Sequence, residues 1–254
     1  MTERDPLAGD SSLGGMYRSA GLSTEGDLSW ADDVNFLDDV GQPLIPAEHQ
    51  VSALAQALAS DNLRYGIYDE PGVGKTVPAL AWLLYWASAG NRCIGLMPPT
   101  LQGQFVRSMT DQMSGLPERF IPVSMSEVSK KKREERFFDW NATDSWPLVL
   151  VMSYQLFRGK SLAPWILIPE KKGSKNLVEQ DPEDPYEFTN ARILQDAGYG
   201  ALVFDEAHAL KNRSSLISEY LRQFLGEPGE RALLIMTGTP VKTDLRDPDG
   251  LIHQ

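Results

Sequence analysis

The stretch 68-YDEPGVGKTVPAL-80 decides how the rest of the chain is interpreted, because it joins a short apolar run to a helix. The run "RYGIY" before it has the character of a strand, and "TVPALAWLLYWASAG" after it has the length of a buried helix. Between them, Gly72 and Gly74 would let backbone N–H groups approach a phosphate without obstruction by side chains. A strand, a glycine loop and a helix in this order predict a phosphate-binding loop.

The loop departs from the strict pattern in one respect. That pattern is a glycine, any four residues and then Gly-Lys-Ser/Thr, and it requires glycine at position 69, where this chain has Asp69. In such loops the lysine bridges the β- and γ-phosphates and the Ser/Thr hydroxyl ligates Mg²⁺. An ordinary turn is the alternative, which the flanking strand and helix disfavour. The predicted nucleotide contacts in the loop are Gly72, Val73, Gly74, Lys75 and Thr76.

A second candidate site lies in "ALVFDEAHALKN", residues 201–212, where four apolar residues lead into Asp205 and Glu206. Two adjacent carboxylates at the end of a strand suit a metal–nucleotide site: Asp205 can hold Mg²⁺, and Glu206 can orient and deprotonate an attacking water. A solvated acidic turn is the alternative. We predict Lys75, Asp205 and Glu206 as catalytic residues, and Thr76 and Asp205 as the metal ligands.

The order of apolar segments predicts the fold class. Continuous apolar runs such as "RCIGLM", "PLVLVM" (147–152), "ALVF" (201–204) and "ALLIM" (232–236) are typical of parallel strands buried on both faces. Helical periods alternate with them. We therefore predict an α/β fold, with a mostly parallel sheet and helices on both faces. The segment from about 158 to 192 is rich in Pro, Lys and acidic residues without a period, and we interpret it as a surface insertion.

The N-terminal residues 1–40 carry nine acidic and two basic side chains, out of a net charge of −11 for the chain. With many Gly, Ser and Asp residues, they are predicted to form an acidic, flexible tail before a domain over 41–254. Trp30 and Phe36 either dock on that domain or are incidental. No run approaches the roughly eighteen apolar residues of a membrane span, and no signal peptide is visible, so a cytoplasmic protein without a membrane partner is expected.

Three motifs together resemble the Swi/Snf-type ATPases, the double-stranded-DNA translocases within helicase superfamily two. These are "DEPGVGKT" at 69–76, "DEAHALKN" at 205–212 and "MTGTPVKTDL" at 236–245, which look like motifs I, II and III. Motif I of that family has Asp-Glu where other loops have the first glycine, so Asp69 marks the family. The resemblance implies the N-terminal RecA-like lobe of a helicase over 41–254, with ATP and Mg²⁺ bound and double-stranded DNA as partner.

Further roles are implied by the resemblance at weaker stretches. The segment "LIPAEHQVSAL" (44–54) would make Gln50 the adenine contact, and "LMPPTLQGQF" (96–105) is similar to a motif that contacts the DNA backbone. For the residues that would couple nucleotide binding to DNA contacts, there are simpler alternatives: a partly exposed histidine at 208 and a capped turn at 237–239. The implied DNA contacts are Pro99, Thr100, Ser153 and Tyr154. The implied coupling residues are His208, Thr237, Gly238 and Thr239.

The sequence ends soon after motif III, so the second RecA-like lobe of the family, with its arginine finger, is expected from elsewhere. We interpret the chain as lobe one of an ATP hydrolase, either a fragment or half of a split motor of the kind that phage or prokaryotic genomes can carry. The alternatives are a non-catalytic regulator that binds DNA or a partner, and an ATPase that acts on protein.

Two remaining features have a simpler reading and a functional one. "KKKREER" (130–136) is interpreted as a solvated helix face, with a DNA-backbone patch as the alternative. Trp82 and Trp86 have the spacing of a buried helical stripe, with base stacking as the alternative.

Overall fold

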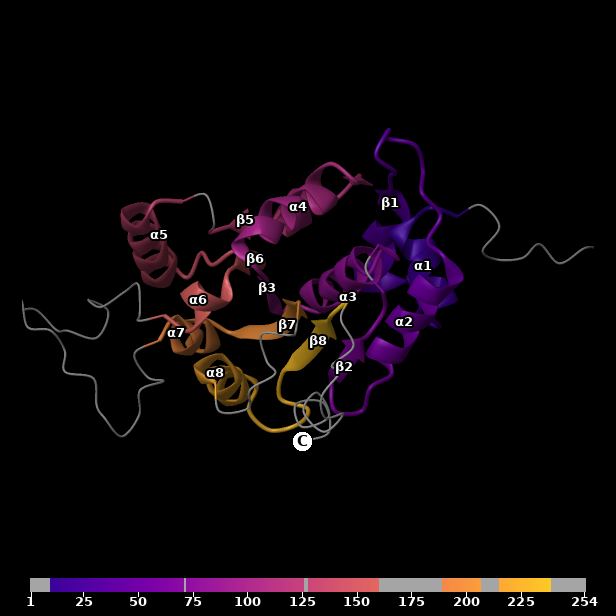
Figure 1. The fold of residues 1–254 in the computed structure, drawn as a ribbon. Coiled ribbons are helices and arrows are strands. Elements are labelled where there is room, and N and C mark those ends of the chain that lie inside the picture. Colours follow the sequence, from indigo (N-terminus) through magenta and orange to yellow (C-terminus); the bar gives the residue numbers. More distant parts are fainter. Residues whose placement is uncertain (1–9, 71, 126–127, 160–188, 207–214, 239–254) are drawn as a thin grey trace, which may run out of the picture.

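A sheet of six parallel strands forms the centre of the molecule, in the order β2-β8-β7-β3-β6-β5 (Figure 1). The computed structural model describes residues 10–70, 72–125, 128–159, 189–206 and 215–238. The predicted parallel sheet is confirmed, and the two-residue strand β5 is an addition that the sequence analysis missed. The strands are β2 (Arg64–Ile67), β3 (Arg92–Leu96), β5 (Val123–Ser124), β6 (Val149–Met152), β7 (Tyr199–Asp205) and β8 (Ala232–Met236).

Helices cover both faces of this sheet, because alternate residues of each strand point to opposite sides. Along β7, Ala201 and Val203 join one core cluster, whereas Leu202 and Phe204 join another. The first cluster includes residues of α2 (Glu48–Leu58), α3 (Thr76–Ser88) and α4 (Pro99–Thr110). The second includes residues of α5 (Lys130–Thr143), α6 (Tyr154–Phe157), α7 (Asn190–Asp196) and α8 (Leu216–Leu225). In Figure 1, α4 lies above β7 and α8 lies below it, with α7 at the left of β7.

Helix α3 is buried around most of its circumference, as expected of a helix that is apolar on all sides. Trp82 is 1% exposed, and its ring lies 6.0 Å from that of Trp86 in an edge-to-face arrangement. The interpretation of these residues as a buried stripe is therefore confirmed for Trp82. The helix that follows the glycine loop is fixed by the core on one side and by the N-terminal segment on the other.

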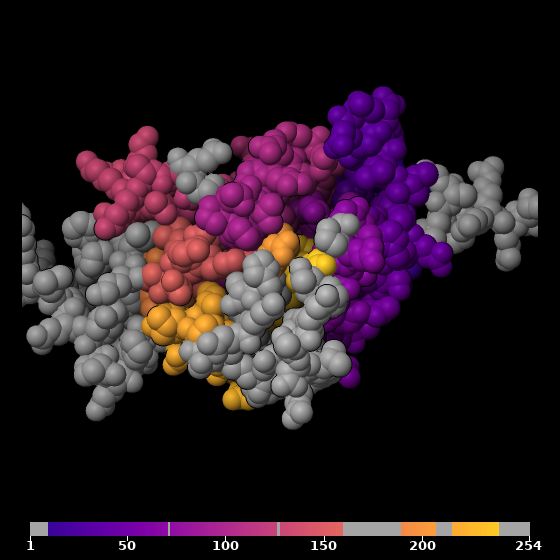
Figure 2. Space-filling model, viewed as in Figure 1, coloured from indigo at the N-terminus to yellow at the C-terminus, as the bar shows by residue number. Residues whose placement is uncertain are grey.

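The N-terminal segment is folded, so the prediction of a flexible tail is wrong for residues 10–40. It forms α1 (Leu13–Ser19), the 3₁₀ helix η1 (Gly26–Asp33) and β1 (Asn35–Phe36), which pairs antiparallel with β4 (Met113–Ser114). Phe36 is 2% exposed, and the ring of Trp30 lies 4.5 Å from that of Phe120. Both aromatic residues are therefore docked. Figure 2 shows the indigo atoms of this segment continuous with the rest of the molecule.

The segment folds because its apolar side chains pack against the core around α3. Leu13, Met16 and Tyr17 are each 1% exposed or less, and they belong to the cluster around α3. The Ser12 hydroxyl caps α1 by accepting a hydrogen bond of 2.9 Å from the Gly15 N–H. The segment is too polar to form a core of its own, but its few apolar side chains are enough to pack as a layer on the core around α3. The described part of the lobe therefore begins before residue 41.

Tyr17 anchors this segment, since its buried hydroxyl donates to the Ala81 carbonyl of α3 at 2.8 Å. We expect Tyr17→Phe to lower the free energy of unfolding by about 1 kcal/mol through loss of that bond. Urea unfolding would measure the change. Tyr65→Phe is the control, because the Tyr65 hydroxyl bonds to Gln56 at the surface and its loss should cost less than about 0.5 kcal/mol. Equal effects of the two changes would contradict the anchoring role.

The two ends of the predicted insertion meet. The Asn190 N–H donates to the Gly159 carbonyl at 3.0 Å, and the Asn190 side chain donates to the Leu156 carbonyl at 2.6 Å. The chain therefore leaves and returns to the lobe at one point, as an insertion requires. Residues 160–188 lie outside the described residues, so their assignment as a surface insertion stays a prediction. Among the helices of the described part, none is long and apolar enough to cross a membrane.

Candidate nucleotide-binding site

The glycine loop leaves the carboxyl end of β2 and enters α3 at Thr76. Gly72 and Gly74 have φ angles of +88° and +79°, in the left-handed region that favours glycine. A Cβ at Gly74 would also lie 2.4 Å from the side-chain nitrogen of Gln50, so no other residue fits there without displacement. Because α3 begins directly after the loop, its unpaired N–H groups are directed to the position that a phosphate would occupy.

Lys75 is held inside the loop by backbone oxygens. Its ammonium donates to the carbonyls of Asp69 and Glu70, both at 2.8 Å. The Asp-Glu pair that replaces the usual first glycine thus contributes its main chain to the lysine. A phosphate oxygen, which carries full charge, would compete with these neutral carbonyls for the ammonium.

Gln50 supports the loop from the first turn of α2. Its side-chain oxygen accepts from the Ala47 N–H at 2.9 Å, and its nitrogen donates to the carbonyls of Gly74 at 3.1 Å and Val73 at 3.3 Å. The structure thus ties both ends of this amide to backbone, where it positions the loop. Adenine recognition by Gln50 stays a prediction.

The two carboxylates lie at the same edge of the sheet as the loop. Strand β8 lies between β2 and β7, and its last residue, Met236, is paired with Ile67 on one side and with Asp205 on the other. Neighbouring strands are about 4.8 Å apart, so Asp205 lies roughly 10 Å from the end of β2. This register brings together motifs that are far apart in the sequence.

The side chain of Asp205 is partly buried. Burial raises the pKa of its carboxyl, and the charge of Glu206 acts in the same direction, whereas a hydrogen bond from the Glu206 N–H at 2.8 Å and the charge of Lys75 lower it. Lys75 therefore lies close enough to Asp205 for its charge to act on this carboxyl. Glu206 has a φ of +56°, in the left-handed region that is uncommon for a residue other than glycine.

Because the pKa of Asp205 is raised on folding, its ionisation destabilises the folded state. Below about pH 4 the group is protonated in both states, and stability is lost as pH rises through the folded pKa. We therefore expect Asp205→Asn to be more stable than the parent chain at pH 7, with a difference that vanishes at acid pH. Urea unfolding across pH would measure it, with the exposed Asp27→Asn as control. A variant no more stable at pH 7 would contradict this prediction.

Tyr154 has a different place from the one expected for a DNA contact. Its side chain is 9% exposed and stacks on Phe204 with ring centroids 4.7 Å apart, and its hydroxyl donates to the Asp205 carbonyl. In the structure Tyr154 positions the end of β7, and a DNA contact by this residue stays a prediction. A tyrosine after an apolar strand could have indicated this role, because a buried hydroxyl needs an acceptor.

The other predicted DNA contacts lie at the same edge of the sheet. Pro99 and Thr100 are exposed at the start of α4, which follows β3. Ser153 follows the neighbouring strand β6, where its hydroxyl caps α6 by accepting from the Leu156 N–H at 3.2 Å. DNA binding by these residues stays a prediction.

Among the coupling residues, the structure describes Thr237 and Gly238. Thr237 is 2% exposed, and its N–H donates to the Ile67 carbonyl at 3.2 Å, which ties the end of β8 to the end of β2. A coupling residue would need such a link to the loop. His208 and Thr239 lie outside the described residues.

A family model described as the SNF2-related domain matches residues 49–253. The chain belongs to the SNF2-related domain family. The resemblance to the Swi/Snf-type ATPases of helicase superfamily two, predicted from motifs I to III, is thereby confirmed.

Relatives of this SNF2-related domain are much longer proteins. This chain is 28% identical over 195 residues to the RAD54-like DNA repair and recombination protein of Drosophila persimilis. The match covers 73% of this chain and 20% of that protein. This chain is 26% identical over 190 residues to the ATP-dependent helicase fft1 of Schizosaccharomyces pombe. The match covers 72% of this chain and 16% of that protein. The chain thus spans one fifth or less of the length of these two relatives.

The fold is similar to that of a solved helicase. The crystal structure of the UvsW helicase from bacteriophage T4 matches with a TM-score of 0.57 at 12% identity, and the match covers 91% of this chain and 65% of that one. At this identity the likeness supports the fold, and it confirms the prediction of a RecA-like lobe.

Proposed function

We propose that this SNF2-related domain is the ATP-binding lobe of a DNA-dependent ATPase that translocates on duplex DNA. The register that pairs Met236 with both Ile67 and Asp205 carries the proposal, because it sets the lysine of the glycine loop beside the Asp-Glu pair. The names of the relatives, a DNA repair protein and an ATP-dependent helicase, support the substrate class.

The residues present fit a nucleoside triphosphate with Mg²⁺. The Thr76 hydroxyl and the Asp205 carboxylate are oxygen ligands of the kind that Mg²⁺ prefers, at the edge where the loop N–H groups are directed. When bound, the ion would neutralise charge on the β- and γ-phosphates. Lys75 would leave the carbonyls of Asp69 and Glu70 for the phosphate oxygens.

Glu206 is proposed as the base for hydrolysis. It follows the proposed metal ligand directly, just beyond the end of β7, with its backbone in the left-handed region. Its carboxylate would hold the attacking water and accept one proton as the oxygen bonds to the γ-phosphorus and the bond to the β-phosphate oxygen breaks. Arginine fingers accelerate phosphoryl transfer by about 10³- to 10⁵-fold in related ATPases, so we propose that full activity needs a second RecA-like lobe.

The test is ATP hydrolysis measured with and without duplex DNA, for this chain alone and with candidate second lobes. We expect weak hydrolysis alone and DNA-stimulated hydrolysis in a productive combination. Lack of DNA-stimulated turnover in every combination would overturn the proposal.

A further inference from the structure

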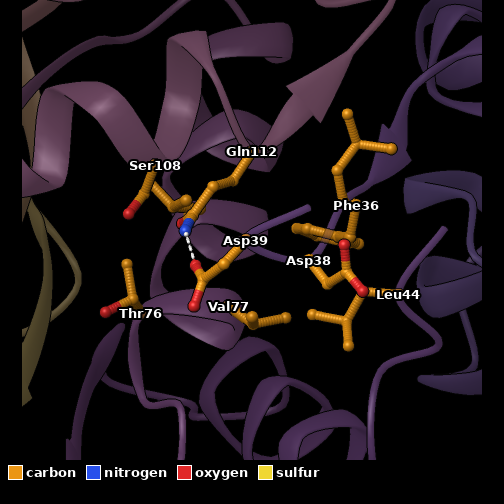
Figure 3. Close-up of a pocket in the computed structure, with 10 residues that line it drawn as sticks. Phe36, Asp38, Asp39, Leu44, Thr76, Val77, Ser108 and Gln112 are labelled. Atoms are coloured by element: carbon orange, nitrogen blue, oxygen red, sulfur yellow. Dashed lines mark hydrogen bonds between the residues drawn. The ribbon is translucent and has the colours of Figure 1, made fainter. Parts of the chain in front are cut away.

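The two sides of the molecule beyond the ends of the sheet differ in charge. Beside the glycine loop, Asp39 and Thr76 line a pocket of about 260 Å³, where the Gln112 side chain donates to the Asp39 carboxylate at 3.0 Å (Figure 3). The N-terminal residues 10–40, which supply one wall of this pocket, carry seven acidic side chains and one basic side chain. In Figure 1 they lie at the right, on the side of β2, whereas α5 lies at the left. A polyanion is therefore repelled from the side of β2.

Helix α5 has the opposite charge at its start. Residues 130–136 contain five basic side chains and two acidic ones. Four of the basic residues, 130–133, form the first turn of the helix, which contains no acidic residue. Because the dipole of a helix favours acidic residues in this turn, these cations lower the stability of α5. A conflict of this kind with a local rule is typical of residues that serve binding.

The basic residues of α5 fall into two groups. Lys130 and Lys131 each lie 3.9 Å from the glutamate four residues later, and these pairs fit the interpretation of the run as a solvated face. Lys132, Arg133 and Arg136 form no ion pair within the part of the chain that the structure describes. At about 100° per residue, these three side chains cover a sector of about 100° on the helix. We call them the basic stripe.

The topology of the sheet places α5 next to the predicted DNA contacts. Thr100 and Ser153 follow β3 and β6, and β5 is the next strand beyond β6. Strand β5 runs parallel to β6, with Ser124 paired with Val151, so α5 follows the carboxyl end of its strand as α4 does. Neighbouring strands are about 4.8 Å apart, which puts the ends of β3 and β5 roughly 10 Å apart. Figure 2 shows the pink atoms of α5 and the salmon atoms of α6 on the same face of the molecule.

We propose that the basic stripe binds the phosphate backbone of duplex DNA and extends the contacts predicted at the ends of β3 and β6. The inference rests on the proposed function, because it adds a subsite to the same DNA path. The ammonium and guanidinium groups would bind phosphate oxygens and would not read bases. Duplex DNA carries one charge per about 1.7 Å of its axis, so a stripe as long as one helical turn, about 5.4 Å, can meet more than one phosphate.

The test is the affinity of the full chain for duplex DNA at several salt concentrations, with Lys132→Gln/Arg136→Gln as the double variant. Each lost phosphate contact should reduce the slope of log affinity against log salt by about 0.9, so the double variant should lose about 1.8. At 0.1 M salt, this loss corresponds to a dissociation constant raised roughly 10- to 100-fold. The affinity for Mg·ATP should not change, because β5 and β2 are opposite edges of the sheet, and it reports that the variant is folded.

The matched control is Lys130→Gln/Lys131→Gln, which removes two positive charges from the same helix but leaves the basic stripe intact. This variant should keep the salt slope of the parent chain. Equal losses in the two double variants would mean that the overall charge of α5 attracts DNA, and would overturn the basic stripe. A loss of affinity for single-stranded DNA alone, with duplex binding unchanged, would overturn the assignment to duplex DNA.

The outcomes separate this inference from the proposed function. If the parent chain binds no duplex DNA at low salt, the proposed function fails, and the inference about the basic stripe fails with it. If the parent chain binds duplex DNA and Lys132→Gln/Arg136→Gln has the same salt slope, the basic stripe alone is overturned.

Discussion

Glu206→Gln should reduce DNA-stimulated ATP hydrolysis by about 10²- to 10⁴-fold, the range that a positioned base contributes. Glutamine has nearly the same size and can still hold a water molecule, but it cannot accept the proton. The affinity for Mg·ATP should stay close to that of the parent chain, because Lys75, Thr76 and Asp205 are unchanged.

Single-turnover hydrolysis, in the most active combination with a second lobe and duplex DNA, measures the effect of this change. Equilibrium binding of ATP is measured in parallel. The control is Glu25→Gln, which makes the same change at an exposed position on the N-terminal segment. If Glu206→Gln hydrolysed ATP at a rate close to that of the control, another group would have to act as the base.

Lys75→Ala should weaken Mg·ATP binding by about 10- to 100-fold, since a hydrogen bond from a charged group is worth about 1.5 to 3 kcal/mol. Only the affinity for the triphosphate should fall. Duplex-DNA binding should survive, because the predicted DNA contacts Thr100 and Ser153 follow β3 and β6, whereas the loop follows β2.

Isothermal titration of ATP and a DNA mobility assay, made on the same preparation, test this prediction. Lys131→Ala is the matched control: Lys131 is exposed on α5 and lies 3.9 Å from Glu135 in a surface pair that contributes little. Urea unfolding of both variants shows whether the loss of the bonds to Asp69 and Glu70 has altered the fold. Unchanged ATP affinity in Lys75→Ala would remove the loop from the site.

The sequence was sufficient for the central sheet and the loop, because both depend on local patterns. Short apolar runs such as "ALVF", repeated between helical segments, are typical of strands buried on both faces of a parallel sheet, and Gly72 and Gly74 have conformations that few other residues adopt. The Asp205–Glu206 pair was predictable for the same reason, as the polar end of an apolar strand.

The N-terminal segment was not predictable from composition. Leu13, Met16 and Tyr17 are separated by residues typical of flexible chains, and they form a layer only because α3 offers an apolar surface far away in the sequence. The place of Tyr154 in the core was missed likewise, since it depends on a stack with Phe204. Contacts between distant segments have no signal in a single sequence.

The position of β8 has a consequence for the order in which the protein is made. This strand is the last in sequence of the six described strands of the sheet, yet it lies between β2 and β7. Until residues 232–236 have left the ribosome, β2 has no strand partner in the six-stranded sheet, and the strand that joins the ends of β2 and β7 is missing. Formation of the site requires this contact between distant segments, which is slow relative to local structure. A nascent chain would therefore acquire the capacity to bind nucleotide only after residues 232–236 have emerged.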